Sequence, residues 1–197
     1  HEESTASKGR QKAYVFDSAA RSIQDALSRR RLDAECFLPP IVQKYGMCLN
    51  QLRWKDSLGS GKKITILIPT KDRVDLLKRC ISSLHKTCNK HFVKILIMDD
   101  RSSDDMTLKY FQELESGKDL ECRVVRPKRG DGTFNYARLI NEAADYVDTP
   151  YLLQLNNDVE AINLGWLEDM MGWMSIDGVG VVGARLLYPD HTLQHLS

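Results

Sequence analysis

The chain has 197 residues, of which 42% are hydrophobic and 28% charged, and its net charge is +1. This length predicts one sizeable hydrophobic core, or one core with a small appendage, and the composition excludes disordered, collagen-like and low-complexity chains. No apolar run approaches the roughly 20 residues of a membrane span, and no signal peptide opens the sequence, so we expect a soluble, cytoplasmic protein. A net charge near zero provides no general attraction to nucleic acid.

Two further features of the composition bear on function. The five cysteines are widely spaced and form no C-x-x-C pair, which favours reduced thiols over a disulfide or zinc framework. Residues 145–197 contain one basic and eight acidic residues. This acidic region is either an ordinary solvated surface or a group of carboxylates around a cation.

The first 61 residues predict an appendage to the main domain. Apolar residues at helical spacing, among them Ile23 and Leu27, predict a helix over residues 13–31. Pro39 and Pro40 interrupt the chain, a strand is expected over residues 47–54, and residues 58–61 have the composition of a linker. We therefore expect an appendage at residues 1–61 and a main domain at residues 62–197.

Strands and helices alternate in the prediction from residue 62 onward. Strands are expected over residues 64–68, 93–98, 122–125, 151–155 and 179–182. Helices are expected between them. The first carries Leu77, Cys80, Ile81 and Leu84 at helical spacing, the second faces Leu108, Phe111 and Leu114 inward, the third carries the stripe from Tyr136 to Val147, and the fourth carries Leu164, Leu167, Met171 and Met174. Ser102 or Ser103 is expected to cap the second of these helices, and capping is the main role expected of the segment Ser102–Asp104. This alternation predicts an open, mostly parallel α/β sheet with helices on both faces.

Polar residues follow the predicted strands, at the edge of the sheet where α/β proteins bind ligands. They are Thr70, Lys71, Asp72 and Arg73, then Asp99 to Asp104, then Arg126, Lys128 and Arg129, then Asn156, Asn157 and Asp158. Any one group could simply cap the helix that follows it. Together these groups predict a nucleotide-diphosphate site. The site would contain adjacent carboxylates, oxygen ligands suited to a hard divalent cation, and basic residues suited to phosphate.

Several of these segments resemble family 2 glycosyltransferases with the GT-A fold, especially bacterial rhamnosyltransferase-like members. The similar segments are residues 64–73, 95–104, 134–144, 155–159, 165–168 and 179–190. The resemblance implies a nucleotide-diphospho-sugar transferase fold, with a mostly parallel sheet flanked by helices. It also implies that this chain carries the donor-binding part, and we expect the domain to continue beyond Ser197. Residues 1–5 and the Arg-rich end of the first helix are similar to segments between modules of large polysaccharide-building glycosyltransferases.

The resemblance also implies roles for individual residues. Thr70, Asp72 and Asp100 would hold the base and ribose of the nucleotide, with Lys71 beside the base and Asp99 in support. The full set implied for nucleotide-sugar binding is Pro69, Thr70, Lys71, Asp72, Asp99, Asp100, Arg129, Asn156 and Asn157. The Asp-x-Asp metal motif of the family is here Asn156-Asn157-Asp158, which leaves Asp158 as the one anionic ligand for Mn or Mg.

The activity implied is inverting sugar transfer from a UDP-, dTDP- or GDP-sugar to a hydroxyl group. The acceptor would be a saccharide or a lipid-linked molecule in polysaccharide or glycoconjugate synthesis, and no nucleic acid partner is expected. The general base is expected beyond Ser197, so no catalytic residue is assigned. A longer chain would allow peripheral association with the inner face of the cell membrane.

Two other functions remain open at this point. One is a non-catalytic nucleotide-sugar-binding module, which would keep the fold and the nucleotide-binding cleft without turnover. The loss of one carboxylate from the metal motif is compatible with such a module. A sugar nucleotidylyltransferase would carry a Gly-rich basic loop directly after its first strand, which residues 69–72 do not supply.

Overall fold

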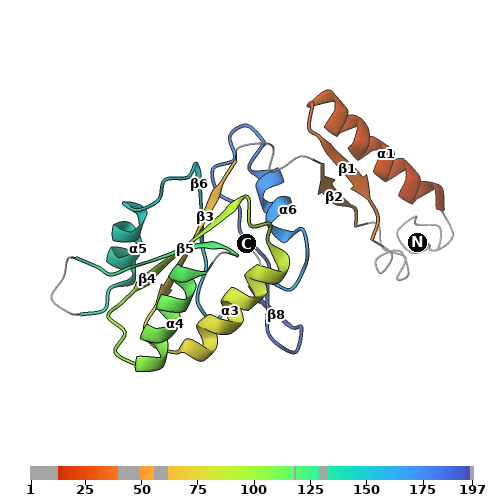
Figure 1. Cartoon of the computed structure of the whole chain (residues 1–197). Helices are drawn as coiled ribbons and strands as arrows, with labels where there is room; N and C mark the ends of the chain where they lie inside the picture. The colour runs from red at the N-terminus through yellow and green to blue at the C-terminus, as the bar shows by residue number, and fades with distance from the viewer. Residues whose placement is uncertain (1–12, 40–48, 56–61, 118, 129–132, 196–197) are drawn as a thin grey trace. The chain divides into compact units, whose positions relative to one another are not determined.

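A parallel sheet of four strands is the centre of one of the two units into which the computed structural model of the chain divides (Figure 1). This unit comprises Leu58–Trp166. Its strands are β3 (Ile64–Thr70), β4 (Val93–Asp99), β5 (Glu121–Val125) and β6 (Tyr151–Gln154), and they lie in the order β5-β4-β3-β6. Because β3 and β4 are the inner strands and are covered on both faces, almost all of their residues are buried.

Helices cover both faces of this sheet. On one face, α5 (Tyr136–Ala144) packs Leu139, Ile140 and Ala143 against side chains of β3, β4 and β5. On the other face, Ile95 of β4 lines a cavity together with residues of α3 (Val74–Thr87) and α4 (Asp105–Ser116). The predicted α/β sheet with helices on both faces is confirmed.

The other unit comprises His1–Ser57 and Leu167–Ser197. It contains α1 (Ala13–Arg29), the antiparallel strands β1 (Ala34–Phe37) and β2 (Gln51–Trp54), most of α6 (Trp166–Trp173), and the short strands β7 (Leu186–Leu187) and β8 (Leu193–His195). Its core is formed by Leu27, Ala34 and Trp54. The helix predicted over residues 13–31 is confirmed as α1, and β2 lies within the strand predicted over residues 47–54.

The structure describes residues 13–39, 49–55, 62–117, 119–128 and 133–195. The predicted linker at residues 58–61 lies outside these ranges. The predicted division between an appendage at 1–61 and a domain at 62–197 stays a prediction. Of the described cysteines, Cys80 and Cys122 are free thiols. None of the helices in these ranges combines the length and the apolar character that crossing a membrane requires.

Two element predictions near the C-terminal end were wrong. Residues 179–182 form no strand, and Val181 is 89% exposed. Four apolar residues alone do not make a strand, because a strand also needs a neighbour for its backbone hydrogen bonds. Leu164 was expected within a helix, but α6 begins at Trp166, and Leu164 lies before it and is 81% exposed.

The cap of α4 lies in the segment Ser102–Asp104, where capping was predicted, but it is the last residue of that segment. Asp104, rather than Ser102 or Ser103, is the N-cap residue, and its Oδ2 accepts a hydrogen bond of 2.8 Å from the Thr107 amide. The Ser102 hydroxyl instead accepts a hydrogen bond from the Asp72 amide. The sequence placed the turn correctly, but it could not show which of several capping residues meets the helix.

Candidate functional site

The carboxyl ends of the parallel strands bring the predicted polar clusters together. Thr70, at the end of β3, is paired in register with Asp99, at the end of β4. After β6, the side chain of Asn157 reaches back to β3, where its Nδ2 donates to Thr70 Oγ1 at 2.9 Å. Residues that are 87 positions apart in sequence thus share one edge of the sheet.

Asp72 joins the turn after β3 to the start of α4. Its Oδ1 accepts hydrogen bonds from the amides of Ser103 and Asp104, at 2.8 and 2.9 Å. Its own amide donates to Ser102 Oγ at 2.7 Å. The backbone hydrogen bonds from Asp104 and Ser103 stabilise the carboxylate and hold the pKa of Asp72 below its ordinary value. One oxygen of Asp72 is therefore already occupied with structural contacts.

The two turns at this edge hold non-glycine residues in the left-handed region of the Ramachandran plot. The φ angles are 50° at Asp72, 51° at Arg73 and 61° at Arg101. This conformation is unfavourable for a residue with a Cβ atom, and it persists where surrounding contacts enforce it. Here the hydrogen bonds of Asp72 and the bond from the Arg101 amide to the Asp99 carbonyl provide such contacts.

Asp99 is a fully buried carboxylate with a complete set of partners. Its Oδ1 accepts from the Ser102 amide at 2.8 Å, and its Oδ2 accepts from Arg126 Nε at 2.7 Å. Arg126 follows β5 directly and also donates to the Ser102 carbonyl. Because both oxygens are used, Asp99 stabilises the edge of the sheet and orients Arg126.

Asp100 is buried to nearly the same degree but is only half satisfied. Its amide donates to the Thr70 carbonyl at 2.8 Å, and its Oδ1 is paired with the Arg101 guanidinium at 2.6 Å. Among the described residues, nothing hydrogen-bonds to Asp100 Oδ2, although the residue is only 3% exposed. A buried carboxylate oxygen without a donor is costly, and it is explained when a ligand supplies the donor.

The remaining predicted residues are arranged less tightly. Pro69 is half-buried, Lys71 and Asn156 are exposed, and the Lys128 amide donates to the carboxylate of Glu142. Arg129 lies outside the described residues. Arg101 is a further residue of this edge with no predicted role, and its position next to the acidic pair was the only signal in the sequence.

The segment Asn156-Asn157-Asp158, which the sequence predicted as the metal motif, contains one carboxylate. Asp158 is exposed at the end of the Asn156-Asn157-Asp158 segment. In the described part of the chain, no group of three or more His, Cys, Asp or Glu side chains could hold a metal ion. Mg²⁺-like cations are often bound through one or two carboxylates together with substrate phosphates. The residues present therefore fit a cation that arrives with a diphosphate, rather than a preformed metal centre.

Cys80 lies beneath this segment as a neutral thiol. Its Sγ is 3.8 Å from the Asn156 carbonyl, to which it donates. Burial, with the nearby carboxylates of Asp158 and Glu160, raises the pKa of Cys80 to about 12. It therefore supports the Asn156 backbone and is no nucleophile at neutral pH.

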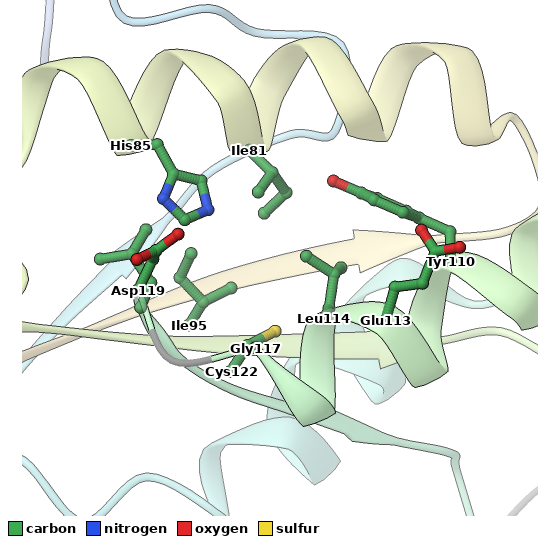
Figure 2. A pocket seen from close by; sticks show the side chains of 10 residues that line it. Ile81, His85, Ile95, Tyr110, Glu113, Leu114, Gly117, Asp119 and Cys122 are labelled. Atoms are coloured by element: carbon green, nitrogen blue, oxygen red, sulfur yellow. The ribbon is translucent and has the colours of Figure 1, made fainter.

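A separate cavity of about 240 Å³ lies between α3, α4 and the sheet (Figure 2). Its lining includes Cys122 near the start of β5, so it lies toward the opposite end of the strands from Asp100. Burial raises the pKa values of Cys122 and Tyr110 to about 12, so both are neutral in the physiological range. This cavity does not belong to the site at the carboxyl edge.

Comparison with known proteins identifies relatives along the whole chain. Residues 65–195 match the family model of glycosyl transferase family 2. Protein y4gI of Sinorhizobium fredii, described as uncharacterized, is 31% identical over 194 residues, or 98% of this chain. The O-antigen biosynthesis protein RfbC of Myxococcus xanthus is 29% identical over 192 residues, or 97% of this chain. The chain spans 20% of the first relative and 14% of the second.

A solved structure shows a similar fold. The mannosyltransferase PcManGT from Pyrobaculum calidifontis, in complex with GDP-Man and Mn²⁺, aligns with a TM-score of 0.54 at 16% sequence identity. The alignment covers 61% of this chain and 35% of the mannosyltransferase. This likeness concerns the fold, and it confirms the GT-A fold that the sequence motifs predicted.

Proposed function

The chain belongs to glycosyl transferase family 2, and from this membership we propose that it binds a nucleotide-diphosphate sugar at the carboxyl edge of its sheet. The sugar is then transferred, with inversion, to a hydroxyl group of a saccharide or lipid-linked acceptor. The name of the Myxococcus relative supports a place in polysaccharide or glycoconjugate synthesis. The donor is a UDP-, dTDP- or GDP-sugar.

The observation that carries this proposal is the buried Asp100 Oδ2 without a donor. The base and the ribose of a nucleotide both present N–H or O–H groups that could fill this position. Asp99 cannot take this role because Arg126 and Ser102 already occupy its oxygens. Asp100 is thus the contact residue of the acidic pair, and Asp99 is the positioning residue.

The other donor contacts follow from their places at the same edge. Thr70 and Asp72 flank Asp100 and complete the nucleoside pocket, with Pro69 and Lys71 beside the base. Asn156 and Asn157 lie toward the diphosphate, and Arg129 is proposed as a further cation for it. Arg101 is held by Asp100 at 2.6 Å and is therefore oriented beside the Asp100 carboxylate.

A divalent cation, Mn²⁺ or Mg²⁺, would stabilise the negative charge of the departing nucleoside diphosphate. Asp158 is the proposed ligand, and the diphosphate oxygens and water would complete the coordination. The mannosyltransferase with the similar fold was solved with Mn²⁺, which supports this class of cation. With one carboxylate in the motif, metal and nucleotide should bind cooperatively, each weakly without the other.

Calorimetric titration of the chain with UDP, dTDP and GDP, with and without Mn²⁺, tests the donor site. We expect Mn²⁺-dependent binding of one of these nucleotides, and a loss of about tenfold to a hundredfold in affinity for Asp100→Asn, because a hydrogen bond to a charged group is removed. Asp145→Asn, at the far end of α5, is the matched control and should bind as the unmodified chain does. If none of the three nucleotides binds the folded chain, the donor-site proposal is wrong.

The metal ligand is tested by a pair of opposite changes. Asp158→Ala should abolish the Mn²⁺ dependence, whereas Asn156→Asp adds a second carboxylate and should strengthen Mn²⁺ binding by about tenfold in the presence of nucleotide. Equal Mn²⁺ affinity in the unmodified chain, Asp158→Ala and Asn156→Asp would contradict the assignment of Asp158 as the metal ligand.

The single carboxylate of the motif also favours a second candidate, a nucleotide-sugar-binding module without turnover. Metal-dependent hydrolysis of the bound donor distinguishes the two functions. Release of free sugar that requires Mn²⁺ and Asp158 supports the transferase, whereas binding without any hydrolysis or transfer supports the binding module.

A further inference from the structure

Thr70, the last residue of β3, connects the two parts of the candidate site. It is only 4% exposed. Its carbonyl accepts a hydrogen bond of 2.8 Å from the Asp100 amide, and its Oγ1 accepts one of 2.9 Å from Asn157 Nδ2. The turn that carries the acidic pair and the segment that carries Asp158 are therefore both bonded to one buried residue.

The Asn157 side chain provides a connection that lies beyond the paired part of the two strands. The pairing of β6 with β3 ends at Leu67, to whose carbonyl the Leu155 amide also donates. β3 itself continues to Thr70, while the chain after Leu155 has left the sheet and forms a turn. Asn157 spans this gap, because its half-buried side chain reaches Thr70 from that turn.

The position of Asp158 depends on this connection. Asp158 follows Asn157 in the turn, and it is exposed. Cys80 holds the same turn less strongly, because a thiol is a weak donor and its Sγ is 3.8 Å from the Asn156 carbonyl. A ligand residue whose backbone is not fixed loses conformational freedom when it binds a cation, and this loss weakens binding. By fixing the turn beforehand, the Asn157 side chain reduces that cost.

We propose that Asn157 is a positioning residue that couples cation binding to nucleotide binding through Thr70. The inference rests on the proposed function of this edge, in which Asp100 holds the nucleoside and Asp158 holds a cation at the diphosphate. One nucleotide can engage both carboxylates only while the two segments keep a fixed separation. The bonds from the Asp100 amide and the Asn157 side chain to Thr70 set that separation.

A positioning role of Asn157 and a direct contact with the diphosphate have different consequences. A direct contact contributes to nucleotide affinity whether or not Mn²⁺ is present. A positioning role contributes to the ratio of the affinities with and without Mn²⁺, and this ratio is the coupling factor between the two ligands. Removing the Thr70 hydroxyl isolates the positioning role, because it releases the Asn157 side chain without changing any atom of Asn157.

Calorimetric titration of the whole chain with UDP, dTDP and GDP in turn, with and without Mn²⁺, measures the coupling factor. We expect Thr70→Val and Asn157→Leu each to lower it about tenfold, because ordering the backbone of one residue has a cost of that size. The double variant should lower it no further, since both changes remove the same bond. Thr70→Ser keeps the hydroxyl and should retain the coupling. Nucleotide affinity without Mn²⁺ should stay close to that of the unmodified chain.

Thr65→Val is the matched control, because it makes the same change at the other end of β3. Thr65 is 3% exposed, and its hydroxyl is 2.8 Å from the hydroxyl of Thr149, which lies just before β6. The control removes a side-chain bond between the same parts of the chain, so it should lower the unfolding temperature but leave the coupling factor unchanged. A loss of coupling as large as that of Thr70→Val would trace the effect to general stability and overturn the proposal.

The remaining outcomes separate this inference from the proposed function. If none of the nucleotides binds the folded chain, the donor site and the coupling are both wrong. Nucleotide binding that is independent of Mn²⁺, or that keeps its full coupling factor in Thr70→Val, overturns the positioning role and leaves the donor site standing. Equal losses of affinity with and without Mn²⁺ also overturn it, because they indicate a direct contact. If Asn157→Leu does not fold, the comparison of Thr70→Val with Thr70→Ser decides.

Discussion

Asp99 and Asp100 are adjacent in sequence but have different roles because successive side chains at a strand end point in different directions. Asp99 meets Arg126 and the Ser102 amide, whereas Asp100 meets Arg101 through one oxygen only. Two neighbouring carboxylates remain buried because each has its own cation. This division leaves one unpaired oxygen, and that oxygen makes Asp100 the residue to test first.

The Asp72 carboxylate should make stability depend on pH in the acid range. Its pKa in the folded chain is below the ordinary value, so its contribution is complete above about pH 4 and is lost as the pH falls through the folded-state pKa. Urea unfolding between neutral pH and the acid range measures this loss. Asp72→Asn, which keeps an acceptor oxygen for Ser103 and Asp104, should lose less stability on acidification. Identical pH profiles would show that Asp72 is not linked to folding.

At the scale of elements, α6 shows why a glycine can be required inside a helix. Glycine lowers helix stability by about 1 kcal/mol relative to alanine, so Gly172 is unfavourable by propensity alone. The helix lies so close to β2 at this point that a Cβ atom on Gly172 would overlap the Trp54 ring. Trp54 is also in edge-to-face contact with Trp173, at 5.4 Å between ring centroids. Close packing therefore outweighs propensity.

Gly172→Ala should consequently destabilise the chain, by about 1–3 kcal/mol, because overpacking exceeds the gain in helix propensity. The free energy of unfolding in urea measures the effect. Gly180→Ala is the matched control, since no atom lies within 4 Å of an added Cβ there. A stabilised Gly172→Ala would show that Trp54 moves aside without cost.

Some elements show the limits of periodicity. The apolar runs of β3 and β4 predicted their strands because a fully buried parallel strand is apolar at nearly every position. Residues 179–182 have the same kind of sequence but form no strand, since apolar character specifies burial and not a pairing partner. β1 was not predicted at all, because Ala34 to Phe37 has no clear alternation and depends on pairing with β2.

At the scale of the molecule, the site exists only because separate βα units are wound in parallel. Thr70, Asp100 and Asn157 come from three strand ends, and the bond between Asn157 and Thr70 joins the last of these to the first. Each crossover returns the chain to the same edge. Binding of nucleotide at this edge should therefore stabilise the folded state of the whole sheet.

A thermal scan tests this linkage. At a ligand concentration of about 100 times Kd, binding contributes about 2.7 kcal/mol, and the transition of the unit formed by Leu58–Trp166 should rise by roughly 10–15 °C. Mn²⁺ with the preferred nucleotide is the ligand. The same shift in Asp100→Asn would mean that the nucleotide binds elsewhere, whereas a reduced shift supports the site.

The sequence by itself determined the α/β alternation, the GT-A fold, the family and the edge of the sheet where the polar residues gather. These features can be predicted from sequence because buried strands, helical stripes and the turns between them are patterns of residues close together in the chain. Only the tertiary structure decided that Arg126 pairs with Asp99 and that Asp100 keeps an unpaired oxygen. It also decided that the side chain of Asn157 meets Thr70. These features depend on distances between residues far apart in sequence, which no local pattern encodes.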